Sequence, residues 1–346
     1  MSVSDATDLV TAAPEDVGVL AERPVLVVDL DGAQPDELAR LTAVTARLPC
    51  VAVGVARSGA PVADLDVLLT EAAVDPGPGP GPPWRWCPDG VDAAVAELVA
   101  AVDRSPRAAT VLVQLLRLGR GRSLDDGITV ESLAYATLQA GPEHQAWLAS
   151  RVARPRALRV LGSPAEPVGV ERDGPTLLVT LRRPHVRNAV DTATRDGLVA
   201  AFELAAADDT VTRVEWRGEG ADFCSGGDLD EFGTAPDPTT AHLVRSTRSP
   251  ARALARVVER TRVEAVVQGA CIGAGLELAA LAHHVTARPD ATFRLPELAM
   301  GLVPGAGGTA TILRRIGPQL TAWMALTGTP VDAPTAVSWG LADTLA

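Results

Sequence analysis

The feature that most constrains the fold is a glycine-rich turn between a strand-like segment and a helix-like segment. The Val-rich residues 263–267 lead into Gln268-Gly-Ala-Cys-Ile-Gly-Ala-Gly-Leu-Glu277, and an Ala/Leu-rich helical pattern follows. Glycine permits tight backbone turns, and the first N–H groups of a helix have no partner inside that helix. The turn is therefore suited to stabilise a negative charge that develops during a reaction.

Two further motifs flank this turn. Upstream, a second glycine-rich turn, Gly220-Ala-Asp-Phe-Cys-Ser-Gly-Gly-Asp228, follows the strand-like residues 211–216. Downstream, Phe293-Arg-Leu-Pro-Glu297-Leu precedes Gly301-Leu-Val-Pro-Gly-Ala-Gly-Gly-Thr309. In this order the three motifs resemble those of the crotonase superfamily, the enoyl-CoA hydratase/isomerase family, over roughly residues 168–346.

The resemblance implies an α/β architecture, the crotonase-like ββα spiral fold, for residues 168–346. It also implies an oxyanion hole of two backbone N–H groups, which on residue-by-residue matching belong to Ser225 and Ala274. Enolate charge forms on the thioester oxygen of an acyl-CoA substrate, and each preorganised donor can stabilise it by about 3 kcal/mol. Ala274 stands where the family has glycine, so its N–H can serve only if the backbone there suits a residue with a Cβ.

Glu277 and Glu297 match the two catalytic glutamates of the family, and their spacing of 297 − 277 = 20 residues is similar to that of its hydratase members. Addition of water to a 2-enoyl thioester needs one group that takes a proton from water and one that delivers a proton to Cα. By resemblance, Glu277 activates the water and Glu297 protonates Cα. For either residue alone, a solvated surface glutamate is the ordinary alternative.

A third set of residues is expected to bind the substrate. Arg182-Arg-Pro-His-Val-Arg-Asn-Ala-Val190 resembles the family signature that lies against the CoA nucleotide, and its cations would supply a local positive charge. Asp228 is expected to fix its turn rather than act as an acid. The implied substrate- and CoA-binding residues are Arg182, Arg183, His185, Arg187, Gly226, Gly227, Asp228 and Gly273.

These residues favour an enoyl-CoA hydratase, a lyase whose only coenzyme is the CoA of its thioester substrate. Three alternatives remain open. The first is an enoyl-CoA isomerase, in which Glu297 alone moves a proton, and the second is a cofactor-independent oxygenase of the same superfamily, whose members also carry an N-terminal extension. The third, from a different class, is a non-catalytic acyl-CoA-binding or scaffold subunit. The motifs specify neither the acyl group nor a pathway.

The composition bears on possible binding partners, cellular location and metal sites. The chain has 31 basic and 43 acidic side chains, which disfavours binding to nucleic acid or to an anionic membrane surface. No apolar run approaches the roughly 20 residues of a membrane span, and the first residues lack a signal-peptide pattern, so we expect a cytoplasmic protein. The four cysteines lack CxxC spacing and the five histidines form no metal pattern, so we expect reduced, packed thiols and no metal site.

The first half of the chain carries none of these motifs but also reads as α/β. We expect residues 1–22 to form a flexible tail and residues 23–161 an N-terminal domain, with a boundary at residues 162–167. The expected elements are strands at 24–30 and 50–56, helices at 35–46, 62–73 and 91–102, a Pro-Gly loop at 75–83, and two helices within residues 130–152.

The order of these elements suggests a degenerate crotonase-like repeat, although any two α/β segments share such an order. The family usually continues with a helical tail where this sequence stops at Ala346, and the helices at 130–152 are candidates to take its place. Crotonase domains usually bury apolar surface against sister subunits. We therefore expect a homo-oligomer, a trimer or smaller, in which the first half covers part of that surface.

Overall fold

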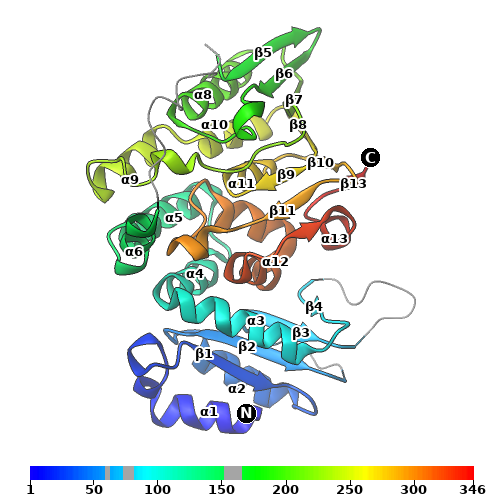
Figure 1. The fold of residues 1–346 in the computed structure, drawn as a ribbon. Coiled ribbons are helices and arrows are strands. Elements are labelled where there is room, and N and C mark those ends of the chain that lie inside the picture. The colour runs from blue at the N-terminus through cyan, green and yellow to red at the C-terminus, as the bar shows by residue number, and fades with distance from the viewer. Residues whose placement is uncertain (59–62, 73–81, 152–165) are drawn as a thin grey trace.

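The structure is a computed structural model that describes residues 1–58, 63–72, 82–151 and 166–346 (Figure 1). The Pro-Gly run at 75–83 and the boundary expected at 162–167 lie largely outside the described residues. Among the described helices, none is both long and apolar enough to cross a membrane. All four cysteines are free and buried, as predicted.

The C-terminal half is built on a six-stranded sheet of order β13-β10-β8-β7-β6-β5. β5 and β6 form an antiparallel hairpin, and the other strands pair in parallel. In β6 every second residue is buried, the pattern of a strand with one face on the core. The strands are β5 (Val168–Asp173), β6 (Thr176–Leu181), β7 (Arg213–Gly218), β8 (Arg262–Val267), β10 (His284–Ala287) and β13 (Thr344–Leu345).

Helices connect these strands and cover the sheet, and a three-stranded sheet of order β12-β11-β9 lies beside it (Figure 1). The strands of this second sheet are β9 (Ala270–Ile272), β11 (Thr292–Arg294) and β12 (Val331–Asp332). The helices are α8 (Thr192–Ala207), α9 (Pro238–Thr247), α10 (Pro250–Val258), α11 (Ala274–Ala279), α12 (Gly308–Thr327) and α13 (Ala333–Trp339), and the 3-10 turns are η3 (Pro184–Val186), η4 (Leu229–Glu231) and η5 (Glu297–Met300).

The N-terminal half contains a four-stranded parallel sheet in chain order. Its strand β2 is buried along its whole length because both faces are covered. Val53 belongs to the large core shared with the rest of the chain, whereas its neighbour Ala52 faces a smaller core under α1 and α2. The elements are α1 (Val3–Ala12), η1 (Pro14–Asp16), η2 (Val19–Ala21), β1 (Val25–Asp29), α2 (Pro35–Thr45), β2 (Val51–Ala56), β3 (Val67–Thr70) and β4 (Arg85–Trp86).

Two expectations for this half are wrong. Residues 1–22 are not a loose tail, because α1 is capped by the Ser2 hydroxyl and buries Val3, Ala6 and Val10 against the small core. Their spacing of three and four residues is that of an amphipathic helix, which the acidic residues between them obscured. Residues 62–73 do not form a helix either. Their described part contains β3, a fully buried strand whose short sequence, Val67-Leu-Leu-Thr70, is ambiguous between strand and helix from sequence alone.

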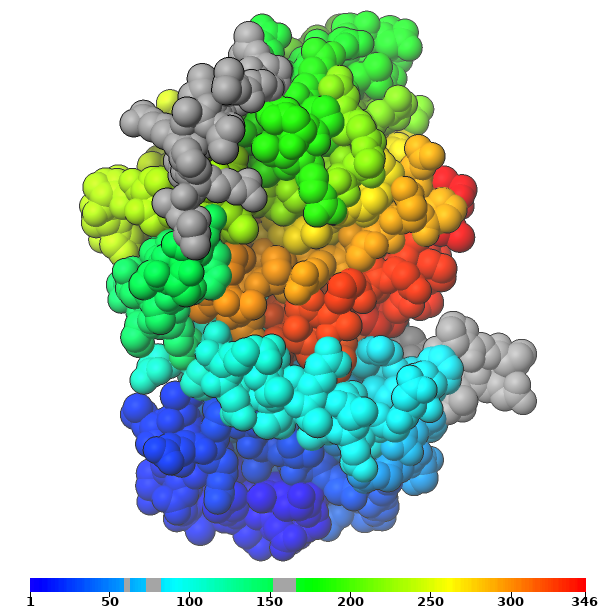
Figure 2. Space-filling view, viewed as in Figure 1, coloured from blue at the N-terminus to red at the C-terminus, as the bar shows by residue number. Residues whose placement is uncertain are grey.

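Four helices join the two halves: α3 (Val91–Arg104), α4 (Pro106–Gly119), α5 (Leu124–Gln139) and α6 (Pro142–Ser150). α3, α4 and α5 contact α12, and one hydrophobic cluster runs from the N-terminal sheet through these helices into the C-terminal half. In Figure 2 the cyan helical layer lies between the blue N-terminal residues and the red and orange C-terminal ones. The two expected domains therefore share a core.

The internal repeat is not confirmed. The unit β1-α2-β2 corresponds to β6-α8-β7, since both are parallel neighbours joined by a helix. After that unit the halves differ: β3 and β4 follow β2, and α3 leads into α4 rather than into a strand. One shared β-α-β unit is too common an arrangement to establish duplication.

Candidate functional site

The two glycine-rich turns lie side by side. Cys224 of the first turn and Cys271 of β9 form a parallel bridge, in which the Cys224 N–H donates to the Ala270 carbonyl and the Ile272 N–H to the Cys224 carbonyl, both at 2.9 Å. Gly273 follows with a φ of 51° and is the N-cap of α11. A Cβ at Gly273 would lie 2.6 Å from Oε1 of Glu297, so this position requires glycine for both reasons.

Ala274 satisfies the condition set by its Cβ. It is the first residue of α11, and it is not among the residues with positive φ, since the left-handed conformation falls on Gly273 instead. Its N–H belongs to the first turn of the helix, where no intrahelical acceptor exists. Ala274 also lines the pocket that contains Glu277 and Glu297. Its position is thus compatible with the oxyanion role expected for it.

Ser225 does not fit the role of second oxyanion donor. Its backbone N–H donates to the Arg187 carbonyl at 2.9 Å and is not available to a substrate. In the parallel bridge between Val190 and Gly227, the Val190 N–H donates to the Gly226 carbonyl and the Asp228 N–H donates to the Val190 carbonyl. The N–H of Gly227 takes no part in this bridge and faces away from Val190. Gly227 lines the pocket. The structure therefore moves the candidate donor from Ser225 to Gly227, two residues further along the same turn.

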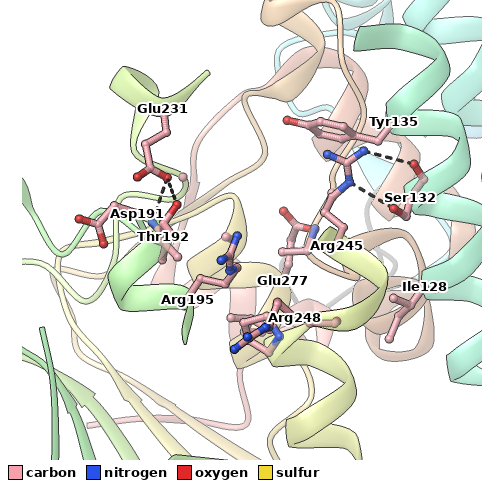
Figure 3. Close-up of a pocket in the computed structure, with 18 of the residues that line it drawn as sticks. Ile128, Ser132, Tyr135, Asp191, Thr192, Arg195, Glu231, Arg245, Arg248 and Glu277 are labelled. Carbon is pink, nitrogen blue, oxygen red and sulfur yellow. Dashed lines mark hydrogen bonds between the residues drawn. The ribbon is translucent and has the colours of Figure 1, made fainter. Parts of the chain in front are cut away.

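The pocket has a volume of about 250 Å³ and lies between the glycine turns, α8, α9 and the N-terminal helix α5 (Figure 3). Its wall combines apolar side chains with both predicted glutamates and three arginines. The lining residues are Ile128, Ser132, Tyr135, Val190, Asp191, Thr192, Arg195, Gly227, Glu231, Phe232, Arg245, Arg248, Ser249, Pro250, Ala274, Glu277, Leu278, Glu297, Gly305 and Ala306.

Glu277 lies in α11 and is only 2% exposed. Its Oε2 accepts hydrogen bonds from the backbone N–H groups of Ala306 at 2.7 Å and Gly308 at 2.8 Å. Burial raises the pKa of this carboxyl to about 7, while the backbone donors oppose the shift by favouring the ionised form. A carboxyl that titrates near neutrality suits a group that takes up and releases a proton.

Glu297 begins η5 and is also buried. Its Oε2 is inaccessible to solvent and has no hydrogen-bond partner among the described residues. Burial, and next the negative charge of Glu277, raise the pKa of Glu297 well above its usual value. Glu297 is therefore the carboxyl expected to keep its proton when Glu277 has lost one.

A third buried carboxyl, which the sequence analysis missed, comes from the N-terminal half. Glu131 of α5 is 1% exposed. Its Oε1 accepts from the Gly307 N–H at 2.6 Å, and its Oε2 accepts from the N–H and the hydroxyl of Thr309 at 2.8 and 2.7 Å. Burial and the charge of Glu277 raise its pKa to about 8. The available signal was a charged residue within the buried stripe of α5.

The substrate-binding arginines predicted from sequence are not in the pocket. Arg183 is buried and pairs with Asp191 at 3.0 Å and Asp228 at 3.3 Å, so Asp228 fixes its turn as predicted. Arg187 pairs with Asp222 at 2.7 Å, and Arg182 with Glu171 and Glu219. The exposed His185 is absent from the pocket wall as well. Each of these arginines already has a carboxylate partner, which the sequence pattern did not reveal.

Comparisons with known proteins match the second half of the chain. Residues 171–346 match the family model described as enoyl-CoA hydratase/isomerase. A 2,3-dehydroadipyl-CoA hydratase of Escherichia coli is 36% identical over 172 residues, which are 50% of this chain and 66% of that protein. A probable enoyl-CoA hydratase of Mycobacterium tuberculosis is 36% identical over 178 residues, 51% of this chain and 68% of that protein.

A solved structure of an enoyl-CoA hydratase from Thermoplasma volcanium is 30% identical, with a TM-score of 0.48 over 53% of this chain and 72% of that one. The chain thus spans about two thirds of the length of these relatives, and its first half is not part of the match. From its matched second half, the chain belongs to the enoyl-CoA hydratase/isomerase family.

Proposed function

We propose that this chain hydrates a 2-enoyl-CoA thioester to the 3-hydroxyacyl-CoA. The observation that carries the proposal is the pair of buried carboxyls in one pocket, whose surroundings push their protonation states apart. Backbone donors favour the ionised form of Glu277, whereas Glu297 has a buried oxygen without a partner and stands next to that charge. Such a pair supplies a base and an acid at the same pH. Both curated relatives described above are named as hydratases.

In the proposed reaction, ionised Glu277 takes a proton from water while the water oxygen bonds to Cβ of the enoyl group. The electron pair of the C–C double bond moves toward the thioester, and its carbonyl oxygen becomes an enolate oxygen. The N–H groups of Gly227 and Ala274 are the candidates to stabilise that oxygen. Protonated Glu297 then gives its proton to Cα. Water and two carboxyls supply every atom transferred, so the reaction needs no cofactor other than the CoA of the substrate.

The assay follows the enoyl-thioester absorbance of crotonyl-CoA, with the product identified by mass. Loss of absorbance with a gain of one water supports hydration. A 3-enoyl thioester tests the isomerase alternative, because isomerisation changes the position of the double bond without a change in mass. If the chain binds acyl-CoA but converts neither substrate, the proposal is wrong and a non-catalytic subunit is the better reading.

A further inference from the structure

One arginine of the pocket is a partly buried cation that forms no ion pair with a described carboxylate. Arg245 of α9 donates from Nε to the Ser132 hydroxyl at 3.2 Å, and its guanidinium lies over the Tyr135 ring at 4.4 Å from the centroid (Figure 3). Burial lowers its pKa. No carboxylate among the described residues lies within ion-pair distance of Arg245, in contrast to the three arginines of residues 182–187.

The carboxyls of the pocket wall cannot easily supply that counter-charge. Glu231 accepts from the N–H and the hydroxyl of Thr192 at 2.9 and 3.0 Å, and Asp191 caps α8 and pairs with Arg183. The charge of Glu131, next to Ser132, acts on Arg245, but both oxygens of Glu131 are occupied by Gly307 and Thr309 and form no ion pair with it. A cation withdrawn from water is costly unless it is paired. The pocket therefore offers an anion site that the described protein groups leave open.

Arg248 adds to this site. It is an exposed residue that follows α9 directly and lines the same pocket. In Figure 3 it lies below Glu277, whereas the guanidinium of Arg245 points toward Ser132 and Tyr135. The fork of an arginine matches a planar carboxylate well. Apolar side chains of Ile128 and Phe232 line the pocket between the polar groups, so the wall suits a short chain of methylene groups that ends in an anion.

We propose that the acyl group accepted here carries a carboxylate at its far end, which Arg245 and Arg248 bind. This inference rests on the proposed hydration, because it takes Glu277 and Glu297 as the markers of the reacting carbons. The phosphates of CoA are a poorer match. The pantetheine arm separates them from the thioester by many bonds, whereas Arg245 shares a pocket of about 250 Å³ with both glutamates. A short dicarboxylic acyl group fits these constraints.

The test compares two six-carbon thioesters that differ in the terminal group, 2-hexenoyl-CoA and 2,3-dehydroadipyl-CoA. We expect a higher kcat/KM for the dicarboxylic substrate. Arg245→Gln should lower the ratio of the two kcat/KM values by about tenfold or more, since it removes one partner of a desolvated charge pair. Arg248→Gln should lower it less. The matched control is Arg256→Gln on α10, whose exposed side chain pairs with Glu203 on the surface and should leave the ratio unchanged.

Calorimetry with the saturated analogues adipoyl-CoA and hexanoyl-CoA separates this inference from the hydratase proposal. If wild type prefers adipoyl-CoA and Arg245→Gln removes that preference, the anion site stands even if neither enoyl substrate is hydrated. If the two analogues bind equally, the inference is overturned. It is also overturned if Arg245→Gln weakens both equally, or if its effect disappears with acyl-pantetheine thioesters, which lack the nucleotide phosphates.

Discussion

The two halves of the chain hold the same backbone segment, residues 306–309, through carboxyls that are bound in different ways. In the C-terminal half, a single oxygen of Glu277, Oε2, accepts hydrogen bonds from the backbone N–H groups of Ala306 and Gly308. In the N-terminal half, Glu131 uses both oxygens: Oε1 accepts a hydrogen bond from the Gly307 N–H and Oε2 accepts one from the Thr309 N–H. Donors thus alternate along the segment between the two halves. This difference shows that burial alone does not identify a proton-transfer group. A carboxyl whose two oxygens both accept hydrogen bonds holds the backbone in place, whereas a carboxyl with one oxygen free of such bonds can transfer a proton.

The largest effects should come from the glutamates of the C-terminal half. Glu297→Gln should lower kcat by about 10²–10⁴-fold with nearly unchanged acyl-CoA affinity, because the amide has the same shape but cannot transfer a proton. Glu277→Gln should abolish hydration, and it can spare the isomerisation of a 3-enoyl thioester. Steady-state kinetics and calorimetry measure both. Full activity of Glu297→Gln would remove it from the mechanism, and parallel loss of both activities in Glu277→Gln would mean that the two glutamates act as one unit.

The next largest effect concerns removal of the N-terminal half. Residues 168–346 expressed alone should be insoluble or aggregated, because α3, α4 and α5 cover the apolar face of α12. The fragment would also lack Glu131 and the α5 wall of the pocket. The measurement is the soluble fraction and the size distribution of the fragment next to the full chain. A monodisperse, fully active fragment would show that the two halves are independent.

A smaller effect should follow from Glu131→Gln, and its sign depends on pH. The raised pKa of Glu131, about 8, means that the native state holds a proton that the unfolded state releases at lower pH. Its contribution to stability is therefore complete below the ordinary pKa, 4.5, and is lost as the pH rises through about 8. Glu131→Gln should flatten this decline in thermal denaturation curves across that range.

The control for Glu131→Gln is Glu203→Gln, an exposed glutamate of α8. It should leave the pH dependence of stability as in wild type. Activity of Glu131→Gln should fall moderately, with a changed pH profile, because an amide N–H would face one of the backbone N–H donors at 307 and 309. An unchanged stability profile would mean that the carboxyl of Glu131 is not the titrating group.

The smallest effect is expected where the sequence placed the nucleotide site. Charge reversal at Arg182 and Arg187 should change CoA-thioester affinity by less than about threefold, since both are exposed or half-exposed and engaged by carboxylates. Calorimetry with adipoyl-CoA at low and high salt compares this variant with Arg248→Glu, which should bind this dicarboxylic thioester more weakly. A tenfold loss of CoA-thioester affinity in the Arg182/Arg187 variant would show that the turn at 182–190 binds the CoA nucleotide.

The sequence predicted those features that depend on residues close together in the chain. The strand patterns predicted β7 and β8, the helix patterns predicted α2 and α3, and the motifs identified Glu277, Glu297 and Ala274, which lie in one pocket. It failed where a role depends on distant partners. Glu131 bonds Thr309 across 178 residues, and Arg245 bonds Ser132 across 113. Ser225 lost its predicted role because its N–H is taken by Arg187, a bond that only the packed turns reveal.

The contact between Glu131 and residues 307–309 also bears on how the molecule is assembled. During synthesis, α5 is complete long before Thr309 is added to the chain. Until then the carboxyl of Glu131 is solvated by water, because its hydrogen-bond donors at 307 and 309 do not yet exist. Closing a loop of this length is entropically costly, and contacts of large sequence separation form late. We therefore expect the pocket to be among the last parts of the protein to become ordered, after both sheets have formed. A nascent chain would acquire its proton-transfer site only when α5 has packed against residues 307–309.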